Sequence, residues 1–221
     1  MLRRSEFLAA GAAGAAAPAV PVIAQASPIP TPPPAGRFDR TAFEAVLARD
    51  TKHKQVFAST QLAGGLVLHY MENSLQAYAI ALAEGAGTLH AAAVLYGPSL
   101  ALALSDAMWA KYPVGAVLDD FGYESTKTRD AALRAARANP YANRVAALAR
   151  GGASFFVCNN ALTGFATQIA ERPPHTRAAA GAIHDDLATH LVDGAMLVPA
   201  GVYALNAAQE ARFTYVQATI G

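Results

Sequence analysis

Short apolar runs alternate with amphipathic stretches along most of this chain, and this pattern constrains the fold more than any other feature. Runs such as "LHAAAVLYG" (89–97) and "ASFFVC" (153–158) lack the alternation of polar and apolar residues that marks a half-exposed strand. Parallel sheets cover both faces of their strands, so their strands have this composition. The intervening stretches carry apolar residues at helical spacing. The sequence therefore predicts an α/β fold, a three-layer α/β/α sandwich with a mainly parallel sheet of about five strands.

Turn and cap signals divide the chain into individual elements. The predicted strands cover residues 54–60, 89–97, 153–158, 195–201 and 213–217. The predicted helices cover 68–85, 99–112 with Ser99 as N-cap, 141–150, about 161–170, 183–194, and 202–212 with Val202 and Leu205 facing inward. Residues 172–182 are predicted to form a loop. Residues 113–141 fit the alternation poorly, and we expect an insertion there that lies against the sheet, with a helix at about 128–138.

Residues 1–26 have the anatomy of an export signal. Arg3 and Arg4 form a charged start, an apolar stretch rich in Ala and Gly follows, and Ala24 and Ala26 frame a small-residue cleavage site. The Arg pair before Phe7-Leu8 resembles a twin-arginine signal, although two residues rather than the usual one separate the pairs. A general secretion signal and an uncleaved anchor are the alternatives.

A proline-rich linker follows at residues 27–40 and precedes a folded domain at 41–221. Prolines keep a chain extended and remove helix hydrogen bonds, so this segment is predicted to be a tether. We expect the mature protein in the periplasm or secreted, without membrane contact once the signal is cleaved.

The charge balance argues against an electrostatic grip on nucleic acid or anionic lipid. Only 15% of the residues are charged, and the formal net charge is +1. Removing residues 1–26 takes away two arginines and one glutamate, which leaves equal numbers of basic and acidic residues. Nucleic-acid binding usually requires a basic surface, so the sequence predicts no nucleic-acid partner.

Cys158 is the single cysteine of the chain, and it ends the predicted strand 153–158. In an exported protein such a thiol is buried and inert, paired with another chain, or reactive. Ligands of open α/β sheets bind at the carboxyl ends of strands. The helix that follows directs its free N–H groups toward that edge, and Asn159 or Asn160 is predicted to be its N-cap. A thiolate is stabilised in such a place and is a nucleophile, whereas the alternative is a small core residue.

The segments "FFVCNNAL" and "GAMLVPAGVYALNAAQEARFTYVQ" resemble the DsrE/DsrF-like family of sulfur-relay proteins. In that family a strand ends in Cys, usually followed by Asn and a helix. A strand closing in Val-Pro-small-Gly-Val, a helix and an aromatic final strand come later. The resemblance covers about residues 54–112 and 145–217, and its specific part is the C-terminal half.

The resemblance implies a trimer or hexamer, and a cysteine that carries sulfur as a persulfide. Cys158 matches that cysteine, and Asn159 and Asn160 are the candidate binding residues beside it. It implies a sulfur donor or acceptor protein as partner and no cofactor. Export and the length of 113–141 depart from the family pattern. A non-catalytic oligomeric binding module, with Cys158 as a structural residue, is the alternative function.

The histidines and acidic residues do not form a convincing metal motif. His184 and His190 are six residues apart, with Asp185 and Asp186 between them, which places the two rings on different helix faces. Helical zinc sites use an i, i+4 pair, and Cys158 has no second cysteine nearby. The sequence therefore predicts no metal site.

Overall fold

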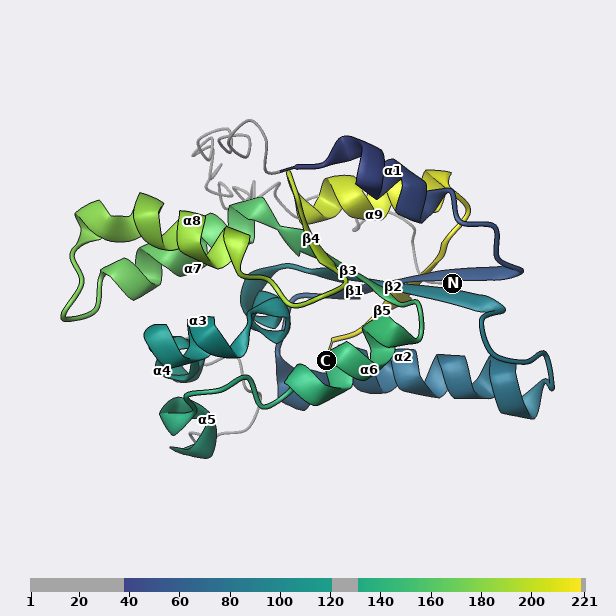
Figure 1. The fold of residues 1–221 in the computed structure, drawn as a ribbon, viewed down its shortest axis with the longest axis horizontal. Coiled ribbons are helices and arrows are strands. Elements are labelled where there is room, and N and C mark those ends of the chain that lie inside the picture. Colours follow the sequence, from purple (N-terminus) through teal and green to yellow (C-terminus); the bar gives the residue numbers. More distant parts are fainter. Residues whose placement is uncertain (1–37, 121–130, 220–221) are drawn as a thin grey trace, which may run out of the picture. The chain divides into compact units, whose positions relative to one another are not determined.

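The computed structural model describes residues 38–120 and 131–219, and the predicted signal and almost all of the linker lie outside this part. Five strands form one sheet in the order β4-β3-β2-β1-β5 (Figure 1). Their bounds are β1 His53–Ser59, β2 Leu89–Leu95, β3 Ser154–Cys158, β4 Ala195–Val198 and β5 Thr214–Gln217. All neighbouring strands in this sheet pair in parallel. The predicted fold class and all five predicted strands are confirmed.

Helical segments connect the strands. In chain order they are α1 (Arg40–Leu47), η1 (Ala63–Gly65), α2 (Leu66–Gln76), η2 (Ala77–Ala81), η3 (Gly97–Ala103), α3 (Asp106–Lys111), α4 (Val114–Asp120), α5 (Ala131–Ala135), α6 (Ala142–Arg150), α7 (Asn159–Ala170), η4 (Arg177–Ala179), α8 (Ala180–Thr189) and α9 (Gly201–Glu210). Among them, η2 is a π-helix that continues α2, and η1, η3 and η4 are short 3₁₀-helices. The helix α1 had no counterpart among the predicted elements.

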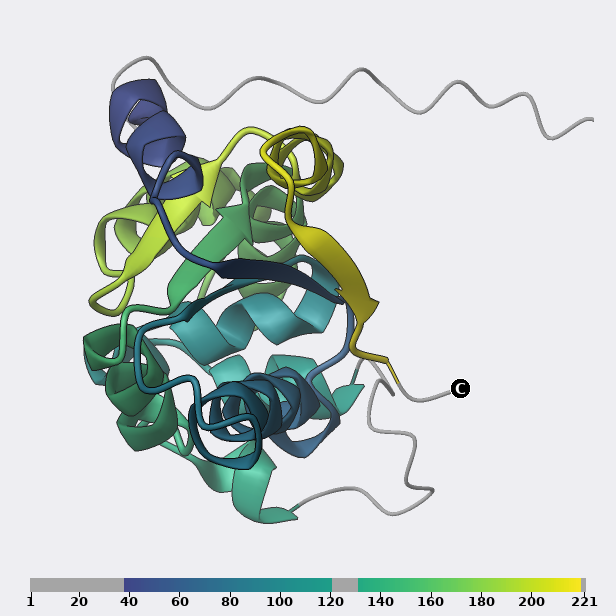
Figure 2. The same cartoon turned by 90° about the vertical axis from the view of Figure 1, so that its right-hand side faces the viewer.

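The strand order explains why the sheet has a helical layer on each face. The chain advances in one direction from β1 to β4, and right-handed crossovers in one direction place their helices on one face. It then returns to pair β5 with the other side of β1, so α9 lies on the opposite face. Figure 2 shows α1 and α9 on one side of the sheet and α2 and α6 on the other.

Each layer encloses its own apolar core. The larger core lies between the sheet and the layer that contains α2, α6, α7 and α8, and includes Phe57, Phe155 and Val157. The smaller core lies under α1 and α9 and includes Phe43 and Phe156. Strands β2 and β3 are buried along their whole length, as the continuous apolar runs predicted.

The prediction of one helix over 99–112 is wrong. The chain forms η3, becomes extended at Leu104, and then forms α3. Leu104 forms an antiparallel bridge with Leu191, which takes its backbone out of helical geometry. Ser99 is not an N-cap either, because its hydroxyl donates to the carbonyl oxygens of Ser59 (2.6 Å) and Tyr96 (3.2 Å). It ties together the ends of β1 and β2.

Two further local predictions are wrong. Residues 172–182 are not all loop, because η4 and the start of α8 fall within them. Val202 is exposed rather than inward-facing, whereas Leu205 is partly buried against the smaller core. The buried side of α9 consists of Gly201, Ala204 and Ala208. These small residues allow the helix to approach the sheet closely. The spacing of apolar residues alone did not indicate which face of α9 would be buried.

The insertion at 113–141 contributes to the larger core through α4 and α5. Val114, Val117 and Leu118 of α4 and Leu133 of α5 are buried there. The two helices pack on each other, and α4 also packs against α7. Part of the helix predicted at 128–138 falls on residues 121–130, outside the described residues. Across the described ranges, no helix is both long and apolar enough to cross a membrane.

Candidate functional site

Cys158 is the last residue of β3 and the N-cap of α7. Its Sγ accepts the backbone N–H of Ala161 at 3.5 Å, and 6% of the residue is exposed. The prediction that Asn159 or Asn160 caps the helix is wrong, because the helix begins at Asn159 and the sulfur itself occupies the acceptor position. The Ala161 N–H, in the first turn of α7, is therefore a hydrogen-bond donor to the sulfur.

The thiol lies at the point where the sheet changes its winding. β3 leads into α7 on one face, and its neighbour β4 leads into α9 on the other face. Cys158 pairs in register with Val198, the last residue of β4. Neighbouring strands whose connections leave on opposite faces open a crevice at their carboxyl ends, where α/β proteins bind ligands. This topology supplies a reason for ligand binding at Cys158 that the sequence could not provide.

The sulfur is directed toward the α9 side of the sheet. Phe156 belongs to the core beneath α1 and α9, and Phe155 and Val157 belong to the opposite core. Side chains alternate along a strand, so Cys158 faces the same side as Phe156. On that side, Tyr96 follows the end of β2 and packs against the same core.

Tyr96 is a member of this edge that sequence reasoning missed. Burial raises its pKa above the ordinary value of 10.0, and the nearby charges of Tyr215 and Cys158 add to the effect. Its ring occupies the space beside Gly201, where an added Cβ would meet ring carbon atoms at 3.1 Å. Gly201, the first residue of α9, therefore leaves room for the Tyr96 ring. The separation of "LYG" and "PAGV" in the sequence did not indicate this contact.

Asn159 faces the opposite side, toward α8. It is 2% exposed, and its Oδ1 lies 2.9 Å from Nε2 of His184, which is 7% exposed. The other ring nitrogen of His184 lies 3.2 Å from Oδ1 of Asp185. Asn160 is half-buried and makes no side-chain hydrogen bond within the described residues. The structure therefore brings Asn159, the neighbour of Cys158, into contact with His184, which the sequence had considered only as a metal ligand.

The other acidic and histidine groups of α8 serve packing. Asp186 accepts hydrogen bonds from Lys111 (2.6 Å) and Tyr112 (2.7 Å) and lies 3.2 Å from His190. These contacts join α3 to α8. In the part of the chain that the structure describes, no group of three or more His, Cys, Asp or Glu side chains could hold a metal ion.

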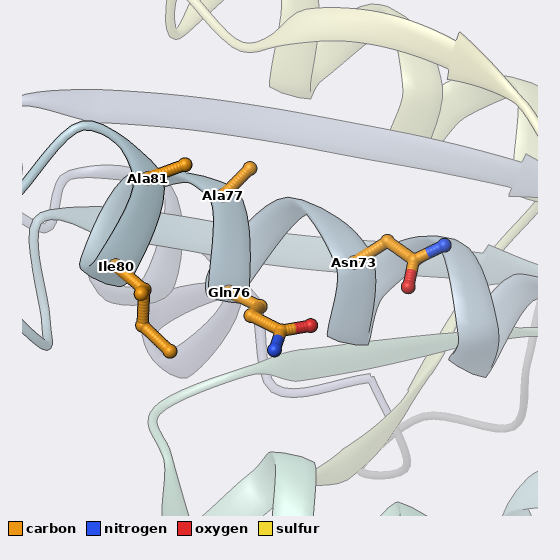
Figure 3. A pocket seen from close by; sticks show the side chains of 5 residues that line it. All are labelled: Asn73, Gln76, Ala77, Ile80 and Ala81. Atoms are coloured by element: carbon orange, nitrogen blue, oxygen red, sulfur yellow. The ribbon is translucent and has the colours of Figure 1, made fainter.

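A hollow on the outer side of α2 and η2 offers no chemistry of its own. Figure 3 shows the five side chains that line it, which are Asn73, Gln76, Ala77, Ile80 and Ala81. None of these side chains titrates or acts as a nucleophile. The carboxyl edge of the sheet around Cys158 is therefore the better candidate for a functional site.

Comparison with known proteins adds little to this description. No protein-family model matches the chain, and no curated protein matches it. Among solved structures, the protein of unknown function MTH1491 from Methanobacterium thermoautotrophicum is similar, with a TM-score of 0.43 and 14% sequence identity. The similarity covers 75% of this chain and 98% of that chain. The function of this chain therefore has to be inferred from its own residues.

Proposed function

We propose that this protein binds sulfane sulfur on Cys158 and passes it on, as a sulfur carrier of the DsrE/DsrF-like type. The observation that carries the proposal is the position of the sulfur. It caps α7, accepts the Ala161 N–H, and lies at the carboxyl ends of β3 and β4, whose connections leave on opposite faces of the sheet. A space-filling cysteine needs neither the helix terminus nor this edge of the sheet.

The chemistry needs only the thiol and a sulfane donor. The Cys158 thiol loses its proton to water, and the thiolate attacks the outer sulfur of a donor such as thiosulfate. A new S–S bond forms while the S–S bond of thiosulfate breaks, and sulfite leaves with the electron pair. The product is a cysteine persulfide whose charged outer sulfur needs hydrogen-bond donors. An acceptor thiolate can then attack that outer sulfur and restore the Cys158 thiolate, so no external oxidant is required.

Oligomer formation and export belong to the same proposal. Val202, in the first turn of α9 beside this edge, is 70% exposed, as is Ile80 in η2. Exposed apolar side chains are often covered by subunit contacts, which agrees with the trimer or hexamer implied by the family resemblance. The mature protein would take up sulfur outside the cytoplasm, since the sequence predicts an export signal.

One observation favours the alternative of a non-catalytic binding module with a structural cysteine. Cys158 is nearly buried, and its sulfur already satisfies a helix N–H. In that case the thiol would resist alkylation until the protein unfolds, and no sulfur would be loaded.

The decisive experiment is intact-mass analysis of the folded protein after incubation with thiosulfate or polysulfide. The expected result is a gain of one sulfur atom that a reductant removes. Cys158→Ser is the matched control, because serine is a preferred N-cap and can accept the same Ala161 N–H. It should keep the fold and lose the sulfur gain. If wild-type protein gains no sulfur from either donor and its thiol reacts only after unfolding, Cys158 is a structural residue and the binding-module alternative holds.

A further inference from the structure

The side chain next to the proposed sulfur-binding thiol is held by a buried polar contact from a different helix. Asn159 and His184 are both more than nine-tenths buried, and their side chains meet at 2.9 Å. The two helices that carry them, α7 and α8, lie side by side (Figure 1). A buried amide or imidazole without a hydrogen-bond partner is destabilising, so these two groups stabilise each other inside an otherwise apolar layer.

The donor in this contact can be assigned from chemistry. The Oδ1 of Asn159 has no hydrogen and can only accept, so Nε2 of His184 carries the proton and donates it. Nδ1 of His184 lies 3.2 Å from Oδ1 of Asp185, and this second contact is a hydrogen bond only when both ring nitrogens carry a proton. The Nε2–H bond by itself joins α8 to the first residue of α7.

The same residue of α7 is held a second time through its backbone. The Thr163 hydroxyl donates to the carbonyl oxygen of Asn159 at 2.9 Å. Asn159 is thus held by one bond within α7 and by one from α8, while Cys158, the preceding residue, directs its sulfur toward the α9 side. The Ala161 N–H that faces the sulfur belongs to this same turn.

We propose that His184 is a positioning residue for Cys158, acting through its Nε2–H hydrogen bond to Asn159. By holding Asn159, His184 keeps the first turn of α7 in the geometry that directs the Ala161 N–H at the sulfur. The inference rests on the proposed function for its chemical consequence, but its structural content can be tested without any sulfur donor.

The first test is amide hydrogen exchange in the full chain, read as the protection of Ala161 relative to Ile169 in the same helix. Removing one hydrogen bond is expected to lower this ratio about tenfold in His184→Leu. His184→Gln keeps an N–H donor and should stay within about threefold of wild type. Asn159→Ala removes the same bond from the other side and should reproduce the loss.

Leu187→Ala is the matched control for packing. Leu187 is fully buried one turn later on α8, so its truncation lowers the unfolding midpoint while both partners of the His184–Asn159 hydrogen bond are kept. The ratio of Ala161 to Ile169 protection should be unchanged in this variant. A normal ratio in both His184→Leu and Asn159→Ala, or an equal fall in Leu187→Ala, would overturn the positioning role.

The second test is the rate of sulfur loading from thiosulfate. His184→Leu should lower the maximal rate about tenfold and leave the half-saturating thiosulfate concentration unchanged, because misplacing a reacting group lowers the chemical step. If wild-type protein loads sulfur and His184→Leu loads it at the same maximal rate, the positioning role is also refuted. If wild-type protein loads no sulfur, the proposed function fails, and the exchange ratio alone decides whether His184 positions the turn.

Discussion

His90 should make the stability of this protein fall steeply below neutral pH. It is 2% exposed near the start of β2, with Nε2 3.2 Å from the Ser154 hydroxyl and the ring edge-on to Phe213. Its Nδ1 finds no hydrogen-bond partner in the described residues. Burial, with smaller effects from the positive charges of Arg49 and Lys54, lowers the pKa of His90 from 6.5 to about 4. A second ring proton would have no acceptor and would face two cations.

The direction and size of the effect follow from proton binding. Below pH 6.5 the unfolded chain binds a proton at His90, whereas the folded protein does not bind it until the pH approaches about 4. The unfolded state therefore holds more protons, and the stability present above pH 6.5 is lost as the pH falls. At about 1.36 kcal/mol per pKa unit, the loss is about 2 kcal/mol at pH 5 and about 3 kcal/mol near pH 4.

The assay is urea denaturation at pH 7.5 and pH 5, comparing wild type with His90→Gln. Glutamine keeps a polar partner for Ser154 and does not titrate, so the variant should lose about 2 kcal/mol less stability between the two pH values. His69→Gln is the matched control for removing an imidazole from the surface, because His69 is exposed on α2. Equal pH dependence in wild type and His90→Gln would refute the reasoning.

Three other predictions concern the insertion, the assembly and the export signal. A Cβ at Gly115 would lie 1.8 Å from the carbonyl oxygen of Leu133, so Gly115→Ala should force α4 and α5 apart and cost about 2 kcal/mol or more in urea denaturation. Gly164→Ala in α7, where a Cβ meets nothing within 4 Å, should instead add about 0.5–1 kcal/mol; equal effects of the two changes would contradict the packing argument. Light scattering of the mature domain should give the mass of a trimer or hexamer, and a monomer at micromolar concentration would reject this assembly. Mass spectrometry of the exported protein should find Ser27 first, and a product that retains Arg3 and Arg4 would show that the segment is not cleaved.

The candidate site was only partly predictable from the sequence. The end of the strand at Cys158 is visible because an apolar run stops there and a polar pair begins. The cap was assigned to the wrong side chain, because asparagine is the more common N-cap and the sequence does not show which acceptor lies nearest the Ala161 N–H. The contacts of Asn159 with His184 and of Gly201 with Tyr96 join residues far apart in the chain. Patterns among neighbouring residues in the sequence do not indicate contacts of this kind.

The sequence by itself determined the parallel α/β architecture, since strands buried on both faces need uninterrupted apolar runs and the helices between them need one apolar stripe. It also located the five strands, because each run ends at a turn, a polar pair or a glycine. Only the tertiary structure decided that Leu104 interrupts a helix, since its partner Leu191 is distant in sequence. Likewise, only the strand order places the change of winding at β3 and β4, because opposite winding on neighbouring strands is a property of the whole sheet. Local composition selects each element, whereas the edges where elements meet depend on contacts that form only when the chain has folded.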